Sequence, residues 1–187
     1  VYLHMFRAML YGSYKRPREL IWIIGMLIFF VLMAEAFAGY LLPWGQMSYW
    51  GAQVIISLFG ALPVIGEELA LWIRGDFVVS DVTLNRFFAL HVIALPLVLC
   101  GLVAAHIIAL HEVGSNNPDG VEIKKHMDPV TGHPVDGIQF HPYYTVKDTF
   151  GTAVFLAVFA AIMFFAPAMG GYFLEYSNFV PANPLQT

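Results

Sequence analysis

Charged side chains are scarce in this chain. They make up 12% of its 187 residues, whereas hydrophobic side chains make up 59%, and a soluble domain carries about 25% charged residues. This composition excludes an ordinary soluble globular protein and predicts an integral membrane protein surrounded by lipid. The net charge of −4 is small, and no stripe of basic and aromatic residues occurs, so we expect no nucleic-acid partner.

Cysteine is nearly absent as well. Cys100 is the single one and lies in an apolar run, which excludes a disulfide framework; we interpret it as a small packed side chain. A start methionine and a signal peptide are also lacking, because the sequence opens at Val1 within an apolar run. Residues 180–187 have the composition of a loop. We therefore expect an internal portion of a longer protein.

Long apolar runs dominate what is present. Residues 1–11 are predicted to end a helix, and the runs 20–42 and 84–111 are each long enough to span a bilayer, which takes about 20 residues. A last span is predicted from about 149 to 168. Residues 46–73 contain no clean span and are predicted to form two short helices at the membrane interface. The predicted fold class is an all-α transmembrane bundle with two interfacial helices.

The loops predict the orientation in the membrane. Most of the Lys and Arg residues lie in the loops 12–18 and 112–147, whereas residues 43–82 carry Arg74 against several acidic side chains. Positively charged loops stay on the cytoplasmic, negative side. The first two loops are therefore predicted on the negative side, and residues 43–82 on the positive side.

Two histidines lie on one long predicted helix. His91 and His106 are fifteen residues apart, which is about 22 Å along an α-helix, and they lie within about 60° of each other around it. Histidine inside a membrane span is usually functional. The geometry suits two stacked haems; two hydrogen-bonded core histidines are the alternative. His4 has the same predicted depth as His106, so we pair these two on one haem. The partner of His91 would precede residue 1.

Other residues fit the same interpretation. Gly25 and Gly39 lie fourteen residues apart on nearly one helix face, and each costs about 1 kcal/mol relative to Ala, so a bulky group is expected there; close helix packing is the alternative. Arg7 and Arg86 lie near the histidines and could pair with haem propionates or simply snorkel. Three further histidines in the loop 112–146 show no ligand spacing, and we interpret them as solvated.

Four blocks of the sequence resemble cytochrome b of the ubiquinol–cytochrome c reductase (cytochrome bc) complex. They are GYLLPWGQMSYWGA at 39–52, LNRFFALH at 84–91, HIIALHEVGSNNP at 106–118 and PYYTVKD at 142–148. The resemblance covers essentially the whole chain. It implies that residues 1–187 are part of the N-terminal di-haem domain, from the end of the second helix through the fourth, and that they run into the C-terminal region from about 149.

The resemblance also implies the cofactors. Two haems b are expected, with His91 on the low-potential haem and His4 with His106 on the high-potential haem. The family's matching glycines, here Gly25 and Gly39, let the haems approach their helix. Ubiquinol and ubiquinone are the implied substrates.

Two quinone pockets follow from the resemblance. A quinol-oxidation pocket on the positive side would be lined by Phe37, Gly51, Ala52, Val54 and Ile55. A quinone-reduction pocket on the negative side would involve His111, Ser115, Asn116, Lys147 and Asp148. An imidazole, an ammonium and a carboxylate beside a haem can supply protons to a reduced quinone, which makes His111, Lys147 and Asp148 the catalytic candidates. Polar groups that cap helix ends are the alternative.

The implied function is that of a respiratory-chain translocase subunit. Quinol would be oxidised on the positive side, with one electron passing to a Rieske iron–sulfur protein and the other through both haems to quinone. A cytochrome c-type subunit, a homodimer of the complex and the lipid of a bacterial inner membrane would complete its surroundings. A passive di-haem anchor of a dehydrogenase is the rival, and residues 43–52 disfavour it because an anchor needs no such pocket. A plastid-type cytochrome b and f complex is disfavoured because the chain continues through 149–168.

Two departures from the family pattern are visible. Respiratory members mostly space the two histidines of this helix by fourteen residues, and the resemblance places the extra residue between His91 and Pro96. Pro96 already removes one backbone hydrogen bond, so we predict a local i→i+5 pattern or a kink just before it, with ordinary helix around His106. Glu35 lies in the middle of a span, where charge is costly. We expect it to be protonated or to face the quinol pocket or a partner helix.

Overall fold

The computed structural model describes residues 1–186; Thr187, the end of the predicted domain, lies outside the described part. The described residues form helices and no β-strand, with isolated bridges at Gly45–Pro181 and Met127–Pro134. This confirms the all-α class. The chain divides into two compact units, which are treated separately below: Val1–Ser115 with the C-terminal residues from Ser177, and Asn116–Tyr176.

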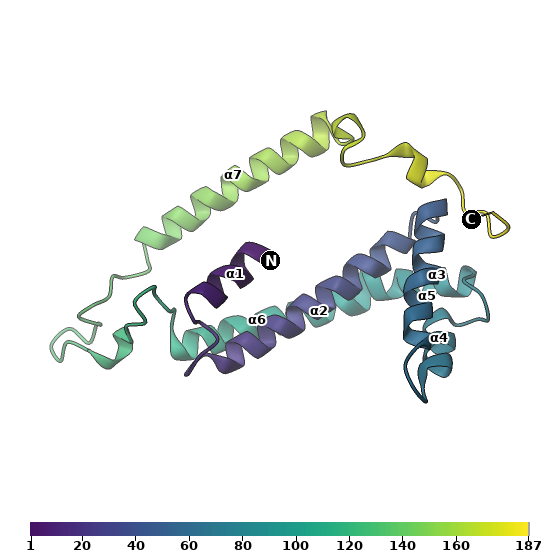
Figure 1. Ribbon diagram of the computed structural model, residues 1–187. Helices are drawn as coiled ribbons and strands as arrows, with labels where there is room; N and C mark the ends of the chain where they lie inside the picture. Colours follow the sequence, from purple (N-terminus) through teal and green to yellow (C-terminus); the bar gives the residue numbers. More distant parts are fainter. Residues whose placement is uncertain (187) are drawn as a thin grey trace. The chain divides into compact units, whose positions relative to one another are not determined.

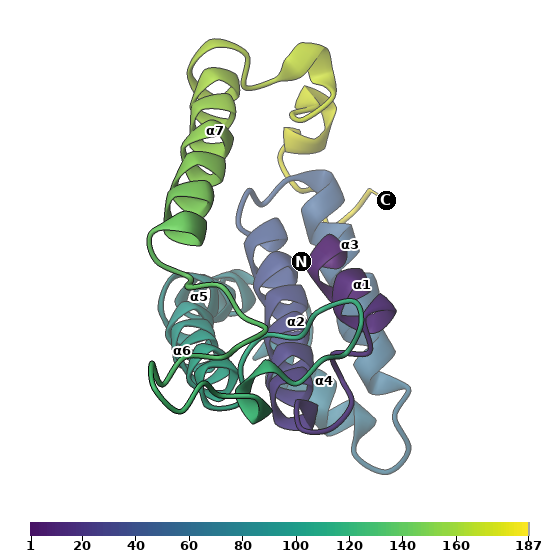
Figure 2. The same ribbon diagram turned by 90° about the vertical axis from the view of Figure 1, so that its left-hand side faces the viewer.

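The first unit contains most of the helices (Figure 1). They are α1 (Tyr2–Leu10), α2 (Glu19–Leu41), α3 (Gln46–Gly60), α4 (Gly66–Arg74), α5 (Asp81–Ala89), the π-helical turn η1 (Leu90–Ala94) and α6 (Leu95–Val113). Helices α2 and α6 lie side by side in both views (Figures 1 and 2) and make the most extensive helix contact. Both are apolar around their whole circumference, which is typical of helices surrounded by lipid and other helices.

The second unit holds one long helix and two short turns. They are η2 (Ile123–Lys125), α7 (Tyr143–Phe165) and η3 (Met169–Gly171), and a further turn, η4 (Tyr176–Phe179), follows at its end. Three stretches of the described chain are long and apolar enough to cross a membrane: Glu19–Leu41, the continuous run Asp81–Val113, and Tyr143–Phe165. The three predicted spans and the two short helices are therefore confirmed.

Some predicted boundaries were wrong. Helix α7 begins at Tyr143, six residues before the predicted start at 149. The span predicted from 84 also begins earlier, because α5 starts at Asp81; Pro17 precedes α2, which begins at Glu19. Glu19 does lie in the first turn, where a negative charge interacts favourably with the helix dipole.

The buried core of the first unit lies where α2 ends against α3, α4 and α5. Its members are Ala38, Leu41, Tyr49, Ala52, Ile56, Ala70, Val79 and Phe87. The C-terminal residues close over this region: the amide of Gln46 donates to the carbonyl of Val180 at 2.7 Å, and the amide of Ala182 to the carbonyl of Trp44 at 3.2 Å. The α2–α3 turn is thus held by chain segments that are far apart in sequence.

Arg18 holds the opposite end of the helix pair. Its side chain is buried, with 5% of the residue exposed. Its Nε donates to the carbonyl of Gly114 at 3.0 Å and its Nη2 to that of Ser115 at 3.3 Å. A guanidinium that caps the free carbonyls of a helix end is favourable for both charge and hydrogen bonding. The start of α2 is therefore fixed to the end of α6.

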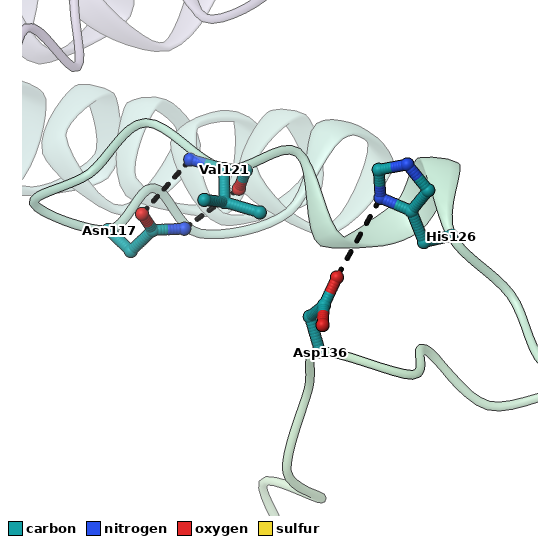
Figure 3. Close-up of polar contacts among 4 residues, drawn as sticks. All are labelled: Asn117, Val121, His126 and Asp136. Carbon is teal, nitrogen blue, oxygen red and sulfur yellow. Dashed lines mark hydrogen bonds and ion pairs between the residues drawn. The ribbon is translucent and has the colours of Figure 1, made fainter.

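The polar loop of the second unit is ordered by short-range contacts (Figure 3). The side chain of Asn117 accepts from the amide of Val121 at 3.0 Å and donates to its carbonyl at 2.7 Å, and His126 Nδ1 lies 3.7 Å from Asp136 Oδ2. The amide of Val130 donates to Asp128 at 2.8 Å. This bond, followed by hydrogen bonds from Thr131, lowers the pKa of the Asp128 carboxyl.

Candidate functional site

His91 and His106 of the long helix each lie against a glycine of α2. A methyl group on the Cα of Gly39 would stand 2.5 Å from Cε1 of His91, and one on Gly25 would stand 3.1 Å from Cε1 of His106. The bulky group expected over these glycines thus includes the imidazole rings themselves. Gly25 and Gly39 together align two histidines along one face of α2.

His91 and His106 stay in phase with the two glycines of α2 because the π-helical turn η1 contains one extra residue. The histidines are fifteen residues apart and the glycines fourteen. The amide of Leu95 donates to the carbonyl of Leu90, five residues earlier, within the π-helical turn Leu90–Ala94. A π-turn holds one residue more than an α-turn, so it restores the phase to that of a fourteen-residue spacing. The predicted i→i+5 pattern before Pro96 is confirmed, and α6 is regular beyond it.

His4 of α1 stands opposite His106. Their ring centres are 6.3 Å apart, and the ring planes are inclined by 70°. Nδ1 of His106 is buried and has no hydrogen-bond partner among the described residues. With roughly 2 Å from a metal to an imidazole nitrogen and roughly 1 Å from that nitrogen to the ring centre, two axial imidazoles have centres about 6 Å apart. The spacing of this pair therefore fits a metal bound between the two rings.

His91 has a carboxyl group beside it that His106 lacks. Its Nδ1 lies 3.0 Å from the backbone carbonyl oxygen of Glu35 and 3.0 Å from Oε1 of the same residue. An imidazole held at Nδ1 presents Nε2 to a metal. Glu35 therefore faces His91 of the long helix, which confirms one of the three expectations for it, that it faces a partner helix. The signal in the sequence was its position four residues before Gly39, on the same helix face.

The two candidate arginines have protein partners. The guanidinium of Arg7 lies over the ring of Tyr11, 4.9 Å from its centre. Arg86 Nη1 donates to the carbonyl of Trp72. The guanidinium also lies beside Gly75, which ends α4 with a φ of 78°; a methyl group there would stand 2.6 Å from Cζ. Arg86 therefore ties the end of α4 to α5.

The residues predicted to line the quinol-oxidation pocket lie on α2 and α3. The ring of Phe37 meets that of Phe87 edge to face, with centres 5.2 Å apart. Ala52 is buried, whereas Val54 and Ile55 are exposed. A methyl group on Gly51 would meet Tyr40 Cε1 at 3.7 Å, which is ordinary contact. The structure thus presents Val54 and Ile55 on the surface of α3, whereas Ala52 belongs to the buried core.

A cavity of about 430 Å³ adjoins the same interfacial helices and was not predicted. It is lined by Ser57, Gly60, Glu67, Ala70, Leu71, Arg74 and Phe77. The spacing of polar residues in 46–73 gave no signal that would have located it.

The five residues predicted for the quinone-reduction pocket are divided between the two units. His111 lies in the last turn of α6 and Ser115 just beyond its end, whereas Asn116, Lys147 and Asp148 belong to the second unit. Within that unit Asp148 lines a cavity of about 470 Å³ with Phe140, Thr145, Thr149, Thr152, Ala153 and Leu156. Lys147 donates to the hydroxyl of Tyr143 at 2.7 Å and lies 4.3 Å from the centre of that ring.

The loop histidines make separate contacts. His126 pairs with Asp136, His133 lies 3.4 Å from Gln139, and His141 Nδ1 lies 3.3 Å from the hydroxyl of Thr145. Within residues 1–186, no three His, Cys, Asp or Glu side chains gather in a way that would hold a free metal ion.

The fold and the site define a class: a multi-pass helical membrane protein in which histidines are stacked on glycines of a neighbouring helix. The chain belongs to the family described as Cytochrome b(N-terminal)/b6/petB, whose model matches residues 1–171. This confirms the resemblance of the four sequence blocks. Membership of the family implies haem b as the cofactor, and the spacing of the His4–His106 rings fits it.

Relatives with known names agree with the family. Cytochrome b of Allochromatium vinosum is 65% identical over 192 residues, covering 100% of this chain and 46% of that protein. Cytochrome b of Rhodospirillum rubrum is 51% identical, covering 100% and 43%. A chain of a hyperthermophilic respiratory complex III matches with a TM-score of 0.83 and 44% identity, covering 100% and 48%. The chain therefore spans about half the length of these relatives.

Proposed function

We propose that this chain is the haem-bearing part of a quinol–cytochrome c oxidoreductase subunit, which oxidises quinol on the positive side of the membrane and reduces quinone on the negative side. The observation that carries the proposal is the repeated histidine-on-glycine contact, with His106 over Gly25 and His91 over Gly39. A repeat at nearly equal spacing on both helices supports two haem sites, one near each membrane surface.

His4 and His106 would hold one haem, and His91 the other, with a second ligand that precedes residue 1. A bound haem b supplies reversible one-electron transfer. Two imidazole ligands leave no open position on the iron, which favours electron transfer over oxygen binding. Gly25 and Gly39 provide the room that places each imidazole close to α2.

The interfacial helices would bind the quinol on the positive side. Phe37, Gly51, Ala52, Val54 and Ile55 are the proposed lining; Val54 and Ile55 are exposed on α3, and Ala52 belongs to the apolar core. An apolar lining with few polar groups suits a quinone ring and its isoprenoid tail.

On the negative side His111, Lys147 and Asp148 are the proposed proton carriers, with Ser115 and Asn116 nearby in sequence. The Asp148 carboxylate lines a cavity and can pass a proton to a quinone oxygen. The Lys147 ammonium is held over Tyr143, which keeps its charge near the start of α7. Proton uptake here and release on the other side would contribute to proton translocation.

The proposed surroundings follow from the family and the apolar spans. The chain would lie in the inner membrane of a bacterium as an internal part of a longer cytochrome b, with the C-terminal region beginning at about 149. A Rieske iron–sulfur protein, a cytochrome c-type subunit and a second copy of the complex are the proposed partners.

The test is a reduced-minus-oxidised spectrum of the intact complex with haem quantified. We expect two haems b per cytochrome b chain. His4→Ala and His106→Ala should each remove the same high-potential signal, and His91→Ala should remove the other. His126→Ala, which changes a loop histidine, is the control and should retain both. One haem in the wild type, or unchanged spectra in His106→Ala, would contradict the proposal.

A further inference from the structure

Glu35 occupies an unusual position in the middle of α2. The helix is a membrane span of 23 residues, and an acidic side chain inside a span is costly unless it has a partner. Only 18% of the Glu35 side chain is exposed, and 34% of that of His91. Because Glu35 and Gly39 are one helical turn apart, both face the same ring.

Both hydrogen-bond acceptors near His91 Nδ1 belong to this one residue. The backbone carbonyl and Oε1 of Glu35 each lie 3.0 Å from Nδ1. When Nε2 of an imidazole binds a metal, Nδ1 carries the hydrogen and donates it to a carbonyl or carboxylate, which fixes the ring orientation and raises the basicity of the ligand. Glu35 offers both kinds of acceptor.

His106 provides an internal comparison. The residue four before Gly25 is Ile21, as Glu35 is four before Gly39. The backbone of Ile21 lies near His106, but Nδ1 of His106 makes no hydrogen bond of good geometry with any described residue. The two sites thus share a glycine and a histidine, and they differ by one carboxyl group.

We propose that Glu35 is a positioning residue for the haem ligand His91, whose Nδ1–H it accepts at Oε1, and that it lowers the midpoint potential of that haem. The inference rests on the proposed ligation of haem by His91. A more basic ligand stabilises ferric over ferrous iron, so the carboxyl group should favour the oxidised haem. Glu35 thereby widens the difference in potential between the two haems.

Glu35 contributes little that would explain it as a structural residue. Its second oxygen, Oε2, is buried and has no partner among the described residues. A buried polar atom without a partner destabilises the folded protein, and replacing buried charged groups by apolar ones of similar volume is often neutral or stabilising. Glu35→Leu is therefore expected to fold and to assemble.

The experiment compares Glu35→Leu and Glu35→Gln in the intact complex by redox titration of both haems. Glu35→Leu should shift the reduction equilibrium constant of the haem bound by His91 about tenfold toward the reduced form, which raises its midpoint potential by about 59 mV for one electron. Glu35→Gln should give a smaller rise, because its amide oxygen still accepts. The haem of His106 should not move. Glu68→Gln, an exposed acidic residue on α4, controls for loss of a distant charge.

Resonance Raman or EPR spectroscopy of the same samples distinguishes an effect of the hydrogen bond to His91 from an effect of the charge of Glu35 alone. The signature of the iron–imidazole bond should shift in Glu35→Leu at the haem bound by His91. If both haems remain bound and neither potential nor signature changes, the proposal is overturned. A raised potential with an unchanged ligand signature overturns it too, because charge alone would then act.

Should Glu35→Leu fail to assemble, Glu35→Gln carries the test. Retention of both haems in His91→Ala would instead overturn the proposed ligation itself.

Discussion

Gly39 lies directly against His91, and the contact is tighter than the one between Gly25 and His106. A methyl group at Gly39 would stand 2.5 Å from Cε1 and 2.9 Å from Nδ1 of His91, whereas at Gly25 the nearest approach to His106 is 3.1 Å. Since carbon atoms in contact prefer about 3.5–4.0 Å, His91 must move if position 39 gains a side chain. At position 25, a shift of His106 by a few tenths of an ångström would make room for a methyl group.

The first prediction follows from this difference. Gly39→Ala should lose the haem bound by His91, and Gly25→Ala should retain most of the haem bound by His106. Alanine favours a helix by about 1 kcal/mol over glycine, so a loss cannot come from a weaker α2. Haem per chain and the reduced spectrum measure the outcome. Gly101→Ala, at a glycine of α6 with nothing within 4 Å, is the control; equal haem loss at positions 25 and 39 would refute the argument.

The second prediction concerns the carboxylate at the start of α7. Asp148→Asn keeps the size of the side chain that lines the 470 Å³ cavity but removes its ability to carry a proton. Reoxidation of the high-potential haem by quinone should slow by roughly 10²-fold or more, as expected when a positioned acid–base group is lost. Flash-induced haem kinetics would measure it. Quinol oxidation on the other side should continue at its normal rate.

Asp119→Asn provides the control for that experiment. Asp119 lies in the loop of the same unit, where its amide donates to the Asn117 side chain, and its substitution removes the same charge from the same side of the membrane. An unaltered reoxidation rate in Asp148→Asn across the pH range would exclude a proton-carrying role for this residue.

A third prediction separates the redox subunit from a passive haem anchor. Gly51→Trp would fill the space in front of α3, where a methyl group meets only Tyr40 at 3.7 Å. Quinol oxidation should fall to background while both haems stay bound. Leu58→Trp is the control, because Leu58 is 66% exposed on the same helix and tryptophan is favoured at membrane interfaces. Normal turnover in Gly51→Trp would favour the anchor.

The membrane spans could be predicted from the sequence because each follows from one local property, an apolar run of sufficient length. The start of α7 could not. Tyr143, Tyr144 and Lys147 are polar or aromatic and follow Pro142, so they have the composition of a loop. In the structure Lys147 lies over the ring of Tyr143, one turn away, and this i, i+4 contact stabilises a first turn that hydropathy does not detect.

The candidate site was predicted in part. The depths of His4 and His106 indicated the pair that the structure brings to 6.3 Å. The role of Glu35 could not be predicted, because the contact depends on which face of α2 meets α6. That choice is a tertiary one, made by Gly39, Gly25 and the capping of α6 by Arg18. Sequence spacing placed Glu35 and Gly39 on one face but did not indicate the partner of that face.

The last prediction tests the register between α2 and the long helix. The turn Leu90–Ala94 contains one residue more than an α-helical turn needs. Deleting Ile93, whose side chain is 59% exposed, should convert this turn to ordinary α-helix. His91 and His106 would then be fourteen residues apart, matching the glycines of α2. Both haems should stay bound, with spectra close to those of the wild type.

An inserted residue should have the opposite effect. One alanine added after Gly101 rotates His91 by about 100° and moves it by about 1.5 Å relative to His106, and no surplus turn exists in the regular helix α6 to compensate. One of the histidines then leaves its glycine, and we expect one haem to be lost. The measurement is the haem content per chain of the deletion variant and the insertion variant, compared side by side. If the deletion loses a haem and the insertion does not, the π-turn is needed for some local feature of His91 and does not set the register of the two helices.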